Sequence, residues 1–169
     1  EYDDFVDQFI QAIKKRWPHV LLHWEDFGKV NAHRLLTKYR SEICSFNDDI
    51  QGTAAVALAA LISAVAQSSS NFTKQKVVVY GAGTAGVGIA DEIVGAMVRA
   101  GITEEEALSR IWLLNSKGLI TTESKRLESF QVRYAKPISL TKDWKRSDDT
   151  KITLKDVVAN LHPTILIGT

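Results

Sequence analysis

A run of β-branched residues that leads directly into closely spaced glycines constrains the fold more than any other feature of this sequence. Residues 77–80 (VVVY) form an apolar run of strand length, typical of a strand buried on both faces of a parallel sheet. A glycine-rich loop follows at 81–88, and residues 89–100 have the pattern of a helix that Gly101 ends. A strand, a glycine turn and a helix begin a βαβ unit, so we expect a parallel sheet.

Further strand and helix patterns extend this sheet. Residues 111–114 and 164–167 are apolar runs of strand length, and residues 154–161 predict a helix. Thr103 and Glu106 have the spacing of a helix capping box. Strands that alternate with helices predict an α/β fold with a doubly wound parallel sheet of the Rossmann type.

The first third of the chain has a less regular pattern. We expect helices at 5–17 and 31–40, a short strand at 20–24, a polar loop at 46–53, a helix at 54–66 and a serine-rich linker at 68–71. The change of pattern after the linker predicts that the chain has two parts.

The composition argues against several classes of function. The 169 residues carry a formal net charge of +1, so nothing indicates a nucleic-acid partner. We find no apolar run that looks long enough to span a bilayer, and expect no membrane partner. The single cysteine, Cys44, excludes an internal disulfide, and its apolar neighbours predict that it is buried. These features favour a soluble protein of a reducing compartment.

The glycine-rich loop matches the pattern G-x-G-x-x-G between a predicted strand and a predicted helix. In this context the first glycine allows a tight turn, the second lets backbone amides approach a pyrophosphate, and the third lets the helix pack on the strand. Glycines also serve turns that bind nothing, but this placement favours a dinucleotide site. The candidate binding residues are Gly81, Ala82, Gly83, Thr84, Ala85 and Gly86.

The end of the second predicted strand bears on which dinucleotide would bind. A carboxylate at this place usually hydrogen-bonds the adenine ribose, but here the residue is Asn115, followed by Ser116 and Lys117. Asn115 can contact a ribose hydroxyl and repels a ribose phosphate less than a carboxylate does, while Ser116 and Lys117 could attract one. An ordinary turn before Gly118 explains the same residues. The choice between NAD and NADP therefore stays open on these residues.

Two pairs of adjacent carboxylates are candidates for a metal site. Glu25 and Asp26 follow the predicted strand at 20–24, and Asp48 and Asp49 lie in the polar loop. Ligands gather beyond the carboxyl ends of parallel strands, and carboxylates suit Mg²⁺ or Mn²⁺. From spacing alone, surface caps and turns explain these acids better than a metal does. The four histidines show no ligand spacing, and we expect them to have ordinary roles.

Together, these segments resemble the malic enzymes. The resemblance lies in residues 24–27 (WEDF) with Asn31 and Ala32, in residues 46–54 (FNDDIQGTA), in residues 81–83 (GAG) and in the downstream Ile111 and Trp112. It covers essentially the whole chain, and the NDDIQGT stretch is highly specific.

The resemblance implies a metal site and a reaction. In that family, the Glu-Asp pair and the second Asp of Asn-Asp-Asp bind the divalent metal, which assigns Mg²⁺ or Mn²⁺ to Glu25, Asp26 and Asp49, with Asp48 in support. The implied reaction oxidises (S)-malate by hydride transfer to NAD(P) and then decarboxylates the product to pyruvate and CO₂. Beyond the glycine loop, the implied cofactor-binding residues are Asp49, Thr53, Asn115, Ser116 and Gln131.

The resemblance also implies that this chain is a fragment. The family's catalytic lysine and tyrosine belong to a segment upstream of Glu1, and further asparagines lie beyond Thr169, so no principal acid or base is assigned here. We expect residues 1–49 to be part of a malate- and metal-binding domain, and residues 50–169 to be a Rossmann-type NAD(P)-binding domain, incomplete at its C-terminus. The full-length enzyme is expected to be a homo-oligomer in the cytoplasm, or in an organelle matrix if eukaryotic.

Two alternatives stand beside a malic enzyme. Gly28 and the form of the glycine loop also resemble malolactic enzymes, which convert malate to lactate and CO₂, whereas residues 51–55 (QGTAA) favour a malic enzyme. A non-catalytic NAD-binding module would need the glycine loop but would have no use for three converging carboxylates. For the cofactor, Ser116 and Lys117 resemble NADP-using members and Gln131 resembles NAD users, and we favour NAD.

Overall fold

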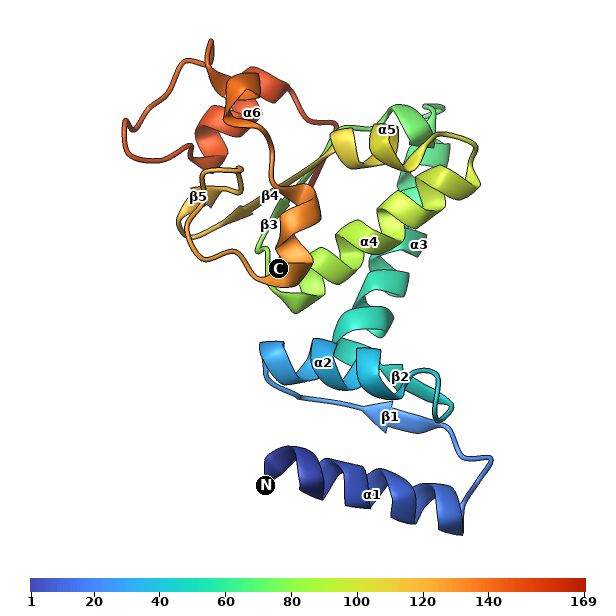
Figure 1. The fold of residues 1–169 in the computed structure, drawn as a ribbon. Coiled ribbons are helices and arrows are strands. Elements are labelled where there is room, and N and C mark those ends of the chain that lie inside the picture. The colour runs from blue at the N-terminus through green and yellow to red at the C-terminus, as the bar shows by residue number, and fades with distance from the viewer.

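The computed structural model describes residues 1–169, apart from the side chains of Lys29 and Val30. Its N-terminal part contains α1 (Tyr2–Arg16), β1 (Leu22–Trp24), α2 (Lys29–Tyr39) and β2 (Ser45–Asn47). A short π-helix, η1 (Asp48–Gly52), continues directly into α3 (Thr53–Gln67), and η2 (Phe72–Lys74) follows. The C-terminal part contains β3 (Val77–Tyr80), α4 (Thr84–Arg99), α5 (Glu104–Ser109), β4 (Ile111–Asn115), β5 (Gly118–Leu119), the 3₁₀ helices η3 (Ser129–Tyr134) and η4 (Ile138–Thr141), α6 (Leu154–Leu161) and β6 (Ile165–Gly168). Figure 1 shows α3 leading from the N-terminal part into the C-terminal part beside α4.

The C-terminal part confirms the predicted doubly wound sheet. Its strands lie in the order β5-β4-β3-β6, with β3, β4 and β6 parallel. Successive side chains of a strand point to opposite faces, so Val77 and Val79 pack with α4 and α5, while Val78 packs with Ile152 and Val157 on the other face. Each face of the sheet therefore buries its own apolar layer.

Three details of this part differ from the sequence prediction. The helix after the glycine loop begins at Thr84 rather than at the predicted position 89, because the small residues and glycines between them are helical. The short β5 pairs antiparallel with β4 and forms an edge of the sheet. The 3₁₀ helix η3 also lay in a stretch for which we predicted no element.

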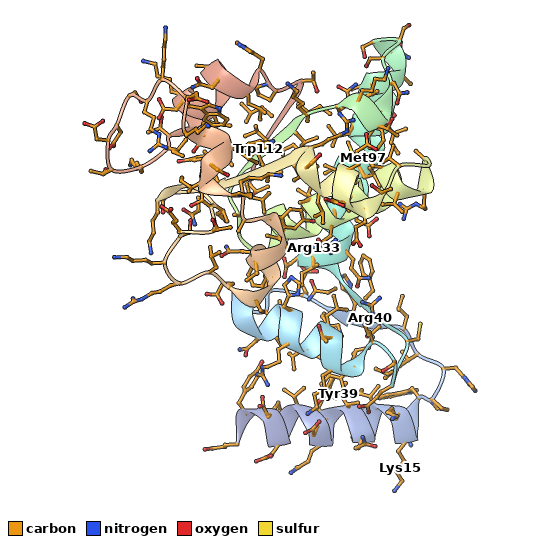
Figure 2. All side chains as sticks on the ribbon, turned by 45° about the horizontal axis from the view of Figure 1, so that its top comes forward. Lys15, Tyr39, Arg40, Met97, Trp112 and Arg133 are labelled. Carbon is orange, nitrogen blue, oxygen red and sulfur yellow. The ribbon has the colours of Figure 1, made fainter. Side chains whose placement is uncertain are left out.

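The N-terminal part is built around a small apolar cluster between α1, β1 and α2. Val6 and Ile10 of α1 contact Trp24, Leu35 and Tyr39. Tyr39 also donates a hydrogen bond from its hydroxyl to the Asp7 carboxylate, and Figure 2 shows its side chain between the two helices. The helices and the first strand agree with the sequence prediction.

Residues 46–53, predicted to be a polar loop, are largely regular in the structure. Ser45–Asn47 is a strand, β2, that pairs in parallel with β1, and the next five residues are the π-helix η1. A three-residue strand is too short to show a period in the sequence, which is why it was missed.

Two expectations from composition are wrong. Cys44 is exposed rather than buried. The stretch Asp48–Gln67 has the length and mean hydropathy, 1.6, of a helix that could cross a membrane. One such stretch is weak evidence for a membrane span. Only 22% of it is buried in the structure, where α3 packs along α4.

Lys136 gives this fold a testable pH dependence. Its side chain is buried, and its Nζ donates to the carbonyls of Leu108 (2.7 Å) and Ser109 (3.2 Å) at the end of α5. Burial lowers the pKa of Lys136 from 10.5 to about 8. Between these two pH values the unfolded chain holds one more proton than the folded chain, so this group makes stability rise with pH in that window.

We therefore predict that Lys136→Met removes this rise. The measurement is the urea midpoint of the intact protein at pH 7 to 10, compared with wild type and with the exposed Lys142→Met as a control. The Lys142 variant should follow the wild-type profile. Parallel profiles for wild type and Lys136→Met would contradict the prediction.

Candidate functional site

The two carboxylate pairs meet because the strands that precede them are parallel neighbours. In the β1–β2 pairing Trp24 lies opposite Asn47, and each strand ends at that residue. Glu25 and Asp26 therefore leave one strand end beside the point where Asp48 leaves the other. Two acidic segments that are distant in sequence are thus brought to the same edge of a small sheet.

Glu25, Asp26 and Asp49 converge at this edge. One carboxylate oxygen from each lies within 4.8 Å of the others. The Asp26 backbone N–H donates to Asp49 Oδ2 at 2.9 Å, and Asp26 has a left-handed backbone with φ of 57°, a conformation that aspartate adopts more readily than most residues. Among the described side chains, none donates to the other oxygen, Oδ1. Three hard oxygen donors at this spacing fit a divalent cation such as Mg²⁺ or Mn²⁺.

His23 joins the acidic cluster, although we expected it to have an ordinary role. Its Nε2 lies 3.1 Å from Glu25 Oε2 and 3.9 Å from Asp48 Oδ1. These three residues form a second group whose ligand atoms lie within 4.8 Å of one another. The signal in the sequence was the two-residue spacing of His23 and Glu25, since alternate residues of a strand share a face.

The π-helix η1 fixes the backbone that carries Asp48 and Asp49. The Asn47 side chain accepts a hydrogen bond from the Ile50 N–H at 2.9 Å, and the Asn47 N–H donates to Gln51 Oε1 at 3.0 Å. Gly52 completes this turn, because a Cβ there would lie 2.3 Å from Asp48 Oδ1. A side chain at this position would therefore displace that carboxylate.

The glycine loop has the geometry that its motif predicts. Gly81 has φ of +125°, which L side chains rarely adopt, and a Cβ on Gly86 would lie 2.0 Å from the Gly81 carbonyl oxygen. Gly83 is the N-cap of α4, and no side chain among the described residues caps that end. The first amides of α4 are therefore available to an anion.

Two adjoining pockets connect the glycine loop with the rest of the candidate site. The larger one, about 570 Å³, is lined by all six loop residues together with Asn115, Ser116, Lys117, Arg126, Glu128, Phe130, Gln131 and Thr169. A smaller pocket of about 360 Å³ is lined by Asp26 and Asp49 on one side and by Thr53, Thr84 and Ala85 on the other. The smaller pocket brings two of the candidate metal ligands to the first turn of the glycine-loop helix.

Asn115 and Gln131 line the larger pocket but are already engaged within the chain. The Asn115 Oδ1 accepts a hydrogen bond from the Lys117 N–H at 2.8 Å, as in the turn that was the alternative explanation of these residues. Gln131 is buried, and its Nε2 donates to the Ala82 carbonyl at 2.5 Å. Ser116 lies between Asn115 and Lys117 at the same pocket wall.

Gly86 provides a test of the loop geometry. Since its Cβ would clash with the Gly81 carbonyl oxygen, we predict that Gly86→Ala in the intact protein forces the loop open and weakens NAD binding about tenfold or more, equivalent to ~1.4 kcal/mol. The matched control is Gly95→Ala on the same helix, where a Cβ would meet only the flexible end of Arg99 at 3.2 Å. The measurement is calorimetric titration with NAD. Equal affinities in the two variants would contradict the prediction.

The sheet and its glycine loop define a Rossmann-type nucleotide-binding fold, and comparison with known proteins identifies the family. Residues 50–169 match the family model described as "Malic enzyme, NAD binding domain", and residues 1–40 match "Malic enzyme, N-terminal domain". The chain belongs to the malic enzyme family.

Curated relatives match along the whole chain. It is 50% identical over 168 residues to an NAD-dependent malic enzyme of Sodalis glossinidius and 45% identical over 169 residues to NAD-dependent malic enzyme 3 of Bacillus subtilis. Each match covers 99% of this chain and 30% of the relative, so the chain spans about a third of the length of these enzymes.

Solved structures share the fold. The NAD-dependent malic enzyme of Thermotoga maritima aligns with a TM-score of 0.68 at 24% identity, covering 96% of this chain and 39% of that one. The malic enzyme of Entamoeba histolytica aligns with a TM-score of 0.66 at 22% identity, covering 98% of this chain and 32% of that one.

Proposed function

We propose that this chain is the metal- and dinucleotide-binding part of an enzyme that oxidatively decarboxylates (S)-malate to pyruvate and CO₂ while reducing NAD. The observation that carries the proposal is the pocket of about 360 Å³ that Asp26 and Asp49 share with Thr84 and Ala85 of the glycine-loop helix. A hydride acceptor and a cation-bound substrate must lie side by side for this reaction, and the pocket adjoins both candidate sites. The names of the curated relatives support the same activity.

We further propose that residues 1–49 belong to the malate- and metal-binding domain and residues 50–169 to the NAD-binding domain. Glu25, Asp26 and Asp49 would hold Mg²⁺ or Mn²⁺, with Asp49 at the boundary. When bound, the cation supplies Lewis-acid chemistry at a substrate oxygen. Asp48 supports the site through its place beside His23, at 3.9 Å from the imidazole Nε2.

The residues of the dinucleotide site bind and orient rather than transfer protons. The amides that open α4 would hold the pyrophosphate, and Asn115 and Ser116 would lie at the adenine ribose. Thr53 faces the smaller pocket and would contact the end of the cofactor nearer the carboxylates. The relatives' names favour NAD over NADP, and they favour a malic enzyme over a malolactic enzyme.

The setting of the intact enzyme follows from the same family relationship. We propose that it is a cytoplasmic homo-oligomer with no nucleic-acid or membrane partner. The bacterial sources of the similar enzymes support the cytoplasm over an organelle matrix.

A substitution at Asp49 tests the metal site. Asp49→Asn keeps an oxygen that can accept the Asp26 N–H bond but removes one charge from the three converging carboxylates. In the full-length enzyme we predict that Mn²⁺ binding, followed by electron paramagnetic resonance, weakens at least about tenfold. Malate oxidation should fall about a hundredfold or more, since a bound cation supplies several kcal/mol of charge stabilisation. The exposed Asp143→Asn is the control. Normal Mn²⁺ affinity in Asp49→Asn would refute the assignment.

Residues 1–169 studied without the rest of the enzyme give a second test. We predict that they bind NAD weakly through the glycine loop but do not oxidise malate. The chain spans about a third of the length of its relatives, and the resemblance implies that the proton-transfer groups lie in the remainder. Their loss would cost ~10²–10⁴-fold, and the substrate would lose the positioning that the remainder supplies. The measurements are calorimetric titration with NAD and NADH production from malate with Mn²⁺. Measurable turnover would show that the catalytic acid and base lie within these residues.

A further inference from the structure

Gln131 is buried, and both polar atoms of its side-chain amide are hydrogen-bonded within the chain. The residue is 7% exposed and lies in η3, beside the glycine loop. Its Oε1 accepts a hydrogen bond from the Glu128 N–H at 3.0 Å, and its Nε2 donates to the Ala82 carbonyl at 2.5 Å. The first bond fixes the orientation of the amide, so that the second presents a donor to the loop.

The bond to Ala82 controls one particular peptide unit of the loop. The described chain has no cis peptide bonds, and in a trans peptide the carbonyl of one residue and the N–H of the next point in opposite directions. Holding the Ala82 carbonyl toward Gln131 therefore holds the Gly83 N–H away from it. The preceding amides are fixed separately, since the N–H groups of Gly81 and Ala82 both donate to the Leu114 carbonyl at 2.9 and 3.0 Å.

The 3₁₀ helix that carries Gln131 is itself anchored on two sides. Phe130 stacks on His33 of α2, with ring centroids 4.7 Å apart and planes 5° from parallel. The Tyr134 hydroxyl donates to Asp91 of α4 at 2.5 Å. The 3₁₀ helix η3 is therefore held against both α2 and α4. A side chain that positions another group needs such a fixed backbone.

We propose that Gln131 is a positioning residue that orients the Gly83 amide toward the pyrophosphate of the cofactor. This inference rests on the proposed function, because it takes the glycine loop to be the NAD site. It gives Gln131 a different role from the one that the family resemblance implied, which was to distinguish NAD from NADP. A residue that acts through the loop affects both cofactors equally, since both carry the same pyrophosphate.

The test uses two variants of the full-length enzyme. Gln131→Met keeps the length of the side chain but removes both hydrogen bonds, and Gln131→Glu places a carboxylate against the Ala82 carbonyl. We expect the KM for NAD to rise about tenfold in Gln131→Met and further in Gln131→Glu. The kcat should stay within about twofold in both variants. In Gln131→Met, which adds no charge, the ratio of kcat/KM for NAD to that for NADP should not change. If Gln131→Glu fails to fold, Gln131→Met still provides the comparison.

Gln75 is a matched control, because it is also 7% exposed and also makes two side-chain hydrogen bonds. Its Nε2 donates to Ser70 Oγ at 3.2 Å and to the Asn71 carbonyl at 2.7 Å, before β3 begins and at the opposite end of that strand from the glycine loop. Gln75→Met should lower the Tm as Gln131→Met does, without changing the KM for NAD.

Two results would overturn the inference. A changed NAD to NADP ratio in Gln131→Met would show that the side chain contacts the ribose end directly. A lowered Tm with an unchanged KM, as expected for Gln75→Met, would show a merely structural role. A failure of the proposed function is separate, because it would appear as wild-type enzyme that neither binds NAD nor oxidises malate.

Discussion

The contact between Gly88 of α4 and the backbone of Ile50 in η1 is the constraint on which the candidate site depends. A Cβ at Gly88 would lie 2.7 Å from the Ile50 carbonyl oxygen, so only glycine allows the two helices to approach this closely. The π-helix begins with Asp48 and Asp49, while α4 begins at the glycine loop. Their close packing therefore sets the distance between the carboxylates and the dinucleotide loop, and it creates the small pocket between them.

The two sheets contribute different kinds of group to the candidate site. The β1–β2 pair places charged side chains at its strand ends. Like charges at this spacing repel, so a cation between these carboxylates would stabilise them. The larger sheet contributes mainly backbone groups and small polar side chains to the pocket at the glycine loop. Thr169, which follows β6, donates from its hydroxyl to the Gly81 carbonyl at 2.8 Å, so the ends of β3 and β6 are joined at the glycine loop. Side chains carry the charge on one side of the site, and the uncapped amides at the start of α4 lie on the other.

Much of this arrangement could be predicted from the sequence, because the elements concerned are long or carry specific chemistry. The β3 strand, the glycine loop and the opposite faces of the large sheet follow from residue type and spacing. The strand β2 could not be predicted, since three residues are too few to show a period, and without β2 nothing in the sequence places Asp49 beside Asp26. Spacing alone therefore favoured surface turns for these acids, and the family resemblance was needed to assign them to a metal.

The same limit applies to Gln131. The family resemblance suggested a residue that distinguishes NAD from NADP, and the structure shows in addition that both polar atoms of its amide are hydrogen-bonded within the chain. A hydrogen bond between residues 49 positions apart leaves no periodic trace in a single sequence. The partner is also a backbone carbonyl, Ala82 O, so no particular side chain at the other end would have signalled it. Residues that orient a binding loop through its backbone are therefore the class of functional residue that sequence patterns identify least well.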